Sequence, residues 1–312
     1  MKITPIDNKG VKTYFLKDRP SKVSIDSFTK RWTKGGSFFE FISGLPDFLA
    51  SKDLIELAGE LIRRHKNNGI IAIGMGAHVI KVGLSPVLIH LMELGFVNSL
   101  SLNGAGIIHD FEISYCGKTS EDVSAEMDNG VFGMAKDTAD MLNSAIGVGA
   151  KEKKGIGESI GRFISGSDFK HKDLSIIGRA YELGIPVTVH VSIGSDIIHM
   201  HPSADGDAIG RSSLIDFKIF TSVVSKLEKG AYLNIGSAVI MPEVFLKALT
   251  LARNLGYTVD DIITVNMDFL QHYRPAANVL ERPTQKAGRF FSFTGHHEIM
   301  LPLLYSLIIE KL

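Results

Sequence analysis

Two glycine turns, each directly after a run of apolar residues, are the first features of the sequence that could do chemistry. The first turn is Gly74-Met75-Gly76-Ala77-His78, and the second is Asn103-Gly104-Ala105-Gly106, which leads into His109 and Asp110. Glycine allows positive φ and lets a ligand approach the backbone closely. The free N–H groups of a following helix can bind an anion. Neither turn completes the three-glycine dinucleotide fingerprint, but together they predict a nucleotide site.

Two histidines offer a different chemistry. His199 and His201 lie on one side of an extended segment, a spacing that metal sites use, and Asp205 and Asp207 follow closely. A metal-dependent hydrolase that uses His199 and His201 is therefore one alternative function.

Two lysines are candidates for covalent catalysis. Lys81 and Lys286 are the lysines closest to the predicted ligand site. A lysine can form an imine with a carbonyl substrate once burial lowers its pKa. The other interpretation of each is a solvated loop lysine. Ser192, Ser195 and Ser237 lack the strand-to-helix elbow of a G-x-S-x-G nucleophile, so serine hydrolysis is not predicted.

The elements that must position these residues alternate between strands and helices. Short apolar runs predict six strands, at residues 70–73, 96–102, 185–191, 231–235, 262–265 and 290–293. Helices between most of them favour an α/β, Rossmann-like, mostly parallel six-stranded sheet that is covered on both faces. Each strand ends in glycine, asparagine, serine, aspartate or histidine. Because ligands bind beyond the carboxyl ends of such strands, this edge is the predicted functional edge.

Two details of this prediction concern local structure. Ser85-Pro86 predicts a helix that starts at Pro86, with residues 75–84 as a loop. The segment that contains Gly155 and Gly157 is basic and lies outside the strand pattern, so we interpret it as a surface connection.

Composition limits the possible functions. The 312 residues carry 34 basic and 34 acidic side chains, so net charge gives no reason to expect a nucleic-acid partner. A single cysteine, Cys116, is compatible with a reducing cytosol, and the first residues lack the apolar core of a signal peptide, so a cytoplasmic protein is expected. The apolar run 299–309 is too short to span a membrane. We expect an N-terminal arm at 1–50 and one nucleotide-binding α/β domain at 51–312.

From about residue 54 onwards the chain resembles deoxyhypusine synthase and its homologues. The segment from Asn103 to Asp110 resembles that family's "T-A-G-G-V-E-E-D" turn, with His109 in place of a glutamate. The strand at Ile185-Pro186-Val187 and the loop that leads to Asp196 resemble a segment that touches cofactor and substrate. Leu301-Pro302-Leu303-Leu304 matches an "F-P-L-L" of the last helix.

The resemblance implies a Rossmann-like sheet, NAD bound across the strand ends, a small-molecule substrate and a homotetramer, without nucleic acid or membrane. For a protein of this kind, our acid–base candidates are Asp196, His109 and Asp110, and the candidate covalent residue is Lys286. The cofactor-binding positions that the resemblance implies are Gly76, Ala77, His78, Asn103, Gly104, Ala105, Met267, Asp268, Gly295 and His296.

The sequence departs from that family in its catalytic part. The tryptophan-glycine-lysine motif is missing, Glu243 replaces a substrate-site histidine, and Arg274-Pro275 stands near a polyamine-binding aspartate. Replacing carboxylates with an arginine points away from a multiply charged amine. The predicted function is therefore NAD-dependent oxidoreduction or group transfer, a transferase of the deoxyhypusine synthase type acting on an unidentified small substrate. A catalytically silent nucleotide-binding protein is the remaining alternative.

Overall fold

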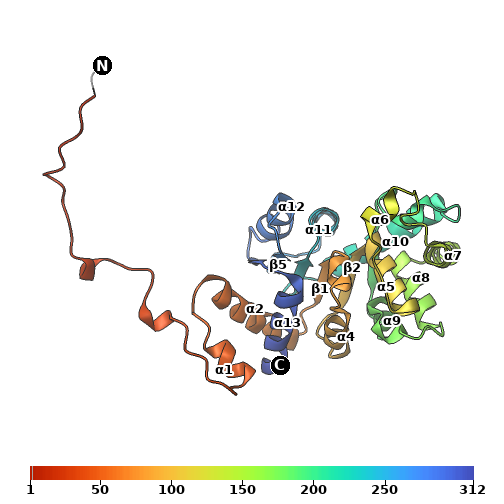
Figure 1. Ribbon diagram of the computed structural model, residues 1–312, viewed down its shortest axis with the longest axis horizontal. Helices are drawn as coiled ribbons and strands as arrows, with labels where there is room; N and C mark the ends of the chain where they lie inside the picture. The colour runs from red at the N-terminus through yellow and green to blue at the C-terminus, as the bar shows by residue number, and fades with distance from the viewer. Residues whose placement is uncertain (2) are drawn as a thin grey trace. The chain divides into compact units, whose positions relative to one another are not determined.

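The computed structural model describes Met1 and residues 3–312 of the chain, shown as a ribbon in Figure 1. The chain divides into two compact units, Met1–Asp53 and Leu54–Leu312. The first unit contains three short helical segments, η1 (Leu16–Asp18), η2 (Ile25–Ser27) and α1 (Phe38–Ser43). A capping box begins α1, because Ser37 and Glu40 bond reciprocally. The long helix α2 (Leu49–Lys66) crosses the boundary between the two units.

The second unit is built on one parallel sheet. Its six strands are β1 (Ile71–Met75), β2 (Ser99–Asn103), β3 (Val187–His190), β4 (Ala231–Ile235), β5 (Ile263–Asp268) and β6 (Arg289–Thr294). Their order is β3-β2-β1-β4-β5-β6 and every neighbouring pair is parallel, which confirms the predicted Rossmann-like fold. The order reverses direction between β1 and β4, so the sheet has a topological switch point there.

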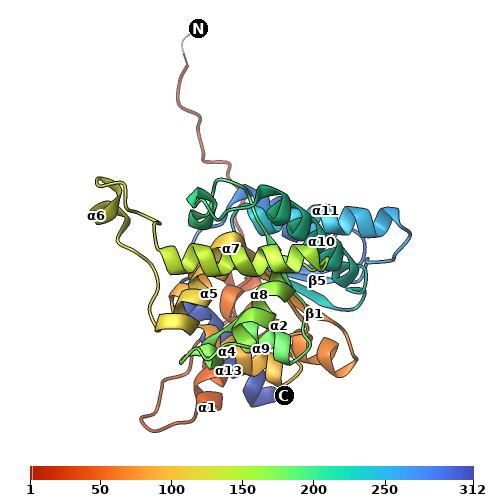
Figure 2. The ribbon, with the colours of Figure 1, turned by 90° about the vertical axis from the view of Figure 1, so that its right-hand side faces the viewer.

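Helices alternate with these strands along the chain. They are α3 (His78–Lys81), α4 (Ser85–Glu93), α5 (Gly104–Cys116), α6 (Val123–Met127), α7 (Lys136–Lys151), α8 (Ile156–Ser165), α9 (Ile176–Glu182), α10 (Gly206–Val224), α11 (Ile240–Asn254), α12 (Tyr273–Pro275) and α13 (His297–Lys311). Single turns form η3 (Lys172–Leu174) and η4 (Ile197–Met200), and η5 (Ala276–Glu281) is a π-helix. Figure 2 shows α7 and α8 toward the viewer, at the end of the unit that carries β3. None of the helices among the described residues is long and apolar enough to cross a membrane.

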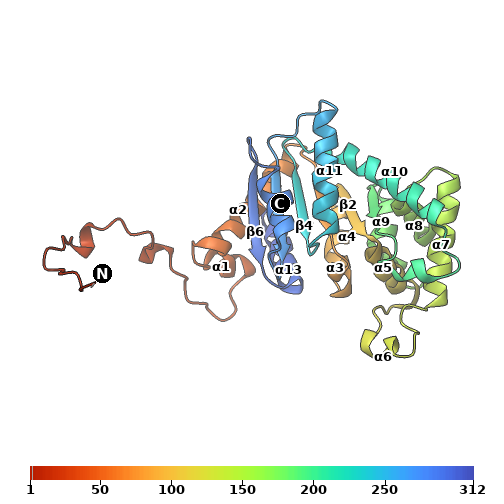
Figure 3. The ribbon, with the colours of Figure 1, turned by 90° about the horizontal axis from the view of Figure 1, so that it is seen from above.

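The core explains why every residue of β1, β4 and β5 is buried. On one face, Tyr232 of β4 stacks on Phe245 of α11, with ring centroids 3.9 Å apart, in a cluster that also includes Phe220 of α10. Residues of β1 and β4 that point to the other face, such as Ile73 and Leu233, are buried as well. The central strands are therefore covered on both faces by helices (Figure 3), whereas four of the six residues of the edge strand β6 are exposed.

Two local expectations are wrong. Residues 75–84 are not only a loop, because they contain the short helix α3, and α4 begins at Ser85 with proline in its first turn. The segment with Gly155 and Gly157 is not a plain surface connection. A Cβ on Gly157 would lie 2.0 Å from the Val187 carbonyl oxygen, so this glycine lets α8 pack directly on β3.

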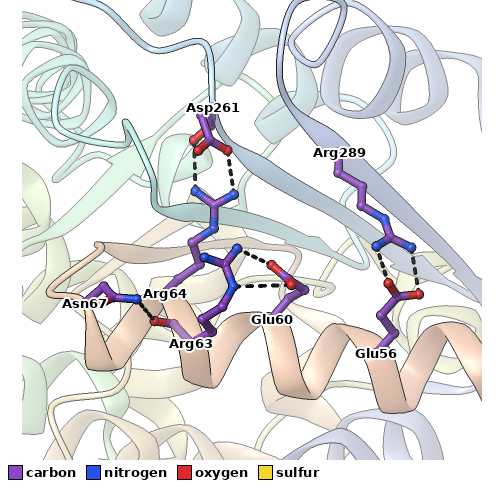
Figure 4. A network of polar contacts seen from close by, with 7 residues as sticks. All are labelled: Glu56, Glu60, Arg63, Arg64, Asn67, Asp261 and Arg289. Atoms are coloured by element: carbon purple, nitrogen blue, oxygen red, sulfur yellow. Dashed lines mark hydrogen bonds and ion pairs between the residues drawn. The ribbon is translucent and has the colours of Figure 1, made fainter.

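Two arginine–carboxylate ion pairs connect helix α2 to the amino ends of β5 and β6 (Figure 4). The Arg64 guanidinium is buried and donates to Asp261 Oδ1 at 2.5 Å and to the Asp261 carbonyl at 3.2 Å. Arg289 binds Glu56 through both guanidinium nitrogens. The Arg289–Glu56 pair is bidentate, and a bidentate pair fixes orientation as well as distance.

We expect Arg64→Met to destabilise the protein by about 2 kcal/mol, because hydrogen bonds to a charged group are lost and Asp261 loses its partner. Arg63→Met is the matched control, since the Arg63 side chain pairs with Glu60 at the surface and the substitution keeps its backbone carbonyl. Urea unfolding measures both. Equal losses for the two variants would contradict the role given to Arg64.

Candidate functional site

The carboxyl ends of the six strands lie along one edge of the sheet, so the polar tips that follow them share that edge. At the switch point, the turns after β1 and β4 touch. A Cβ on Gly76 would lie 2.1 Å from the Gly236 carbonyl oxygen, and Gly236 has a φ of +65°. Glycine at both positions lets the two backbones approach closely at the place where open α/β sheets bind ligands.

A cavity of about 210 Å³ opens beside the ends of β2 and β3. Its lining includes Asp196, His109, Lys81, Glu112 and Glu121. Two of the predicted acid–base residues, Asp196 and His109, therefore meet in one space although 87 positions separate them in the chain. We treat this cavity as the candidate active site.

Asp196 lies against the start of α5. Its side chain is 92% buried, and Oδ2 has no hydrogen-bond partner among the described residues. A Cβ on Gly104 would lie 2.0 Å from Oδ2, so only glycine leaves room for the carboxylate. Burial raises the pKa of Asp196, while His199, Ser195 and the Ala105 N–H oppose that rise. A buried carboxylate with a free oxygen and a raised pKa can accept a proton from a substrate.

Hydrogen bonds fix the tautomer of His109. The Thr119 hydroxyl donates to Glu112 Oε2 at 2.5 Å, so it can only accept from His109 Nδ1, which is 2.6 Å away. Nδ1 therefore carries the proton, and Nε2 is left as an acceptor. Burial, followed by the charge of Lys81, lowers the pKa of His109 to about 4, so the ring is neutral at pH 7.

Asp110 does not face the cavity. It is 1% exposed, and its carboxylate accepts hydrogen bonds from the Ser175 hydroxyl and from the N–H groups of Ile176 and Ile177 at the start of α9. Burial raises its pKa to about 6. Asp110 thus links α5 to α9, and both of its carboxylate oxygens already accept hydrogen bonds.

Lys286 lies away from the candidate site. It precedes β6, and its Nζ is 3.0 Å from Oδ2 of Asp260, which precedes β5. Both residues are at the amino ends of parallel strands, on the opposite edge of the sheet from the cavity. The side chain of Lys286 is 67% exposed. This setting is that of a solvated surface lysine.

The two histidines of the metal hypothesis point to different partners. The Gly194 N–H donates to His199 Nδ1 at 3.2 Å, whereas His201 Nε2 donates to the Gly133 carbonyl at 2.8 Å. Among Met1 and residues 3–312, no group of three or more histidine, cysteine, aspartate or glutamate side chains could hold a metal ion.

The predicted cofactor positions all follow or end strands at the functional edge. Asn103 caps α5 by accepting from the Gly106 N–H at 3.1 Å. The positions after β1 and β2 border the switch point and the cavity, and the positions at the ends of β5 and β6 lie in the other half of the edge. These last are Met267, Asp268, Gly295 and His296.

Sequence reasoning missed several residues of this edge. Glu112 and Thr119 orient His109. The only features of the sequence that could have indicated this role are that both residues are polar and lie close to His109 in the chain. Phe269 and His297 lie after β5 and β6, and nothing in their spacing separates them from core residues. Such roles depend on which loops meet in space, and short sequence patterns do not contain that information.

No protein-family model and no curated protein matches the chain. Several solved structures, in contrast, match the chain. A candidate LOR/SDH protein from Methanococcus maripaludis is 17% identical with a TM-score of 0.55, over 90% of this chain and 75% of that one. A candidate deoxyhypusine synthase from Entamoeba histolytica is 12% identical with a TM-score of 0.52, over 91% and 96% of the two chains. These similarities establish a Rossmann-like fold shared with a deoxyhypusine synthase-like structure.

Two larger enzymes share the fold over part of their length. ArgZ, an arginine dihydrolase of cyanobacteria, is 16% identical with a TM-score of 0.52 over 82% of this chain. AgrE, solved in a ternary complex with ornithine and NAD⁺, is also 16% identical with a TM-score of 0.52 over 82% of this chain. The chain spans only about a third of the length of each, 31% and 32%.

Replacing Gly104 should disturb Asp196. In Gly104→Ala the new methyl group must displace the carboxylate, and overpacking of this kind costs about 1–3 kcal/mol. Gly59→Ala in α2 is the control, because a Cβ there meets nothing within 4 Å, and it should be neutral or stabilising. Thermal unfolding compares the two. A Gly104→Ala protein as stable as the wild type would refute the close contact.

We expect the His109 ring to titrate near pH 4 in an NMR titration of the imidazole signals. Lys81→Met should raise this pKa because it removes a nearby positive charge, whereas Lys66→Met should not change it. Since the pKa lies below the ordinary value of 6.5, the unfolded chain binds this proton more readily. The contribution of His109 to stability is thus complete above pH 6.5 and lost as the pH falls toward 4. Titration above pH 6 would contradict the assignment.

Proposed function

We propose that the protein binds NAD at the carboxyl edge of the sheet and catalyses oxidoreduction or group transfer on a small substrate held in the Asp196–His109 cavity. One observation carries this proposal. An open sheet of the dinucleotide-binding strand order places the turns after β1 and β4 side by side, and at the same edge Asp196, which has a buried oxygen without a hydrogen-bond partner, lines a cavity.

The turns after β1 and β4 meet at the place where open α/β sheets bind dinucleotides. Gly76 and Gly236 allow this close packing, because a Cβ on Gly76 would meet the Gly236 carbonyl and a Cβ on Gly236 would meet His297. The start of α5 does not fit a phosphate, because Asp196 already lies against it. The anionic part of the cofactor therefore belongs beside the turn after β1, with the substrate beside Asp196.

The chemistry that follows is a coupled hydride and proton removal. NAD⁺, when bound, supplies a hydride acceptor. Oxidation of a substrate alcohol or amine carbon also releases the proton of its O–H or N–H group. Asp196 takes this proton, since its raised pKa makes it a stronger base than an ordinary aspartate. His109, neutral and with a free Nε2, accepts a hydrogen bond from the substrate and orients it.

A substrate imine formed with Lys286 is not part of this proposal, because that lysine lies at the opposite edge of the sheet. If the site transfers a group, that group would move directly from the oxidised substrate to an acceptor molecule, without an imine on a lysine. A homotetramer, which the family resemblance implies, remains a proposal for the assembly.

Calorimetric titration with NAD⁺ tests the proposal, and we expect saturable binding together with a rise in melting temperature. Mass spectrometry of small molecules released from undialysed protein then identifies the substrate. With that substrate, Asp196→Asn should bind NAD⁺ like the wild type and lose at least a hundredfold in NADH formation, as is typical for removing a general base. Asp207→Asn, at an exposed surface pair with Arg211, is the control. Absence of both heat and a thermal shift would refute the proposal.

A further inference from the structure

The Asp196–His109 cavity is lined by charged groups of both signs. Lys81 ends α3, and the carboxylates of Glu112, Glu121 and Asp196 come from the segments that follow β2 and β3. His109 is neutral at pH 7 and adds no charge. Lys81 repels a purely cationic ligand, and the three carboxylates repel a purely anionic one. The ligand that complements this cavity therefore carries groups of both signs.

Lys81 is the cation of this cavity, and its counter-ion is not in the protein. Among the residues that the structure describes, no carboxylate lies within ion-pair distance of its Nζ, whereas Lys286 pairs with Asp260. The positive charge of Lys81 helps to lower the pKa of His109, so the ammonium group lies on the His109 side of the cavity. An ammonium with three donors and no partner is suited to bind a carboxylate of a ligand.

Two of the three carboxylates keep an oxygen for a ligand. Both oxygens of Glu112 accept hydrogen bonds from threonine hydroxyls, at 2.5 and 3.1 Å. Glu121, by contrast, accepts only through Oε2, from the Gly133 N–H at 2.8 Å, and its Oε1 bonds to no described residue. Asp196 is 92% buried and lines the cavity, and its Oδ2 has no partner among the described residues. Carboxylate oxygens without partners favour a ligand that donates, such as an ammonium group.

The packing of Gly133 brings Glu121 to the same side of the cavity as Asp196. A Cβ on Gly133 would lie 2.7 Å from Ile197 Cγ2 and 2.8 Å from Met200 Cε, so this glycine packs directly on η4, which Asp196 precedes. The φ of Gly133 is +76°, which also favours glycine. Because the N–H of the same residue holds Glu121 Oε2, the carboxylates of Glu121 and Asp196 are fixed on one side. The cation comes from the end of α3.

We propose that the substrate of this cavity is a small amino acid, whose carboxylate binds Lys81 and whose amino group binds Glu121 and Asp196. This inference rests on the proposed function for taking the cavity as the substrate site, and it adds the chemical class of the substrate. The cavity volume of about 210 Å³ equals that of roughly seven water molecules, so the substrate is small. The amino nitrogen then lies beside Asp196, the base that the proposed function requires.

Calorimetric titration with each common amino acid in turn, with and without NAD⁺, tests this inference, and we expect at least one to bind. Its amine analogue, without the carboxylate, and its acid analogue, without the amino group, should each bind about tenfold more weakly, because each lacks a charge-assisted hydrogen bond. Lys81→Met should weaken the amino acid about tenfold and should not weaken the amine. Glu121→Gln should weaken the amino acid and the amine but not the acid. Lys66→Met and Glu126→Gln, which are outside the cavity lining, are the matched controls.

The outcomes separate this inference from the proposed function. If NAD⁺ binds but no amino acid binds at millimolar concentration, or if either cavity variant binds the amino acid like the wild type, the inference is wrong and the proposed function stands. If an amino acid binds and both variants weaken it, while NAD⁺ gives neither heat nor a thermal shift, the proposed function is wrong and the assignment of the cavity ligand stands. The Lys81 side chain is exposed, so Lys81→Met should keep the wild-type melting temperature. The two analogues test the same contacts without any substitution.

Discussion

The parallel pairing of β1 with both β2 and β4 is the constraint on which the rest of this structure depends. Ile73 is paired with Leu100 on one side and with Leu233 on the other, so the three strands end at one edge, where the turns after β1 and β4 touch. Parallel strands must be joined by crossovers, which place helices on both faces and leave the strand ends as the accessible edge. The topology of the sheet thus determines where the loops meet. The side chains of these loops supply the chemical groups of the site.

Buried carboxylates hold the helices on that frame. Asp110 accepts the N–H groups that begin α9, and Asp216 of α10 accepts those of Gly157 in α8 and Val189 in β3. Burial raises the pKa of Asp216 to about 7. Asp196 lies in the same way against the start of α5. Asp216 and Asp196 each keep one oxygen without a partner among the described residues, but of the three carboxylates only Asp196 lines the candidate-site cavity. Its place at the cavity, and not the free oxygen alone, makes Asp196 the candidate reactive group.

The sequence predicted the sheet well because the central strands β1, β4 and β5 are short, mostly apolar segments followed by glycine or polar residues, a pattern that reflects their burial on both faces. It predicted that Asp196 and His109 share an edge for the same reason. It could not separate Asp110 from them, because the partner that occupies Asp110, the start of α9, lies 65 residues further along the chain. The sequence also could not place Lys286. Only the parallel pairing of the strands shows that this lysine, which precedes β6, lies at the amino end of the strand and away from the functional edge. Only three-dimensional contacts decide such cases.

The switch point joins two chemically different halves of the functional edge. Beyond β1, β2 and β3 lie carboxylates, a lysine and a neutral histidine around a cavity. Beyond β4, β5 and β6 lie aromatic rings around a buried histidine–aspartate pair. The contact of Gly76 with Gly236 brings the halves together without a side chain between them. A ligand that has a flat ring at one end and a reacting partner at the other would use both halves, whereas a small metal-bound substrate would need neither the glycine contact nor the exposed rings. This division is compatible with the extended nucleotide ligand of the proposed function.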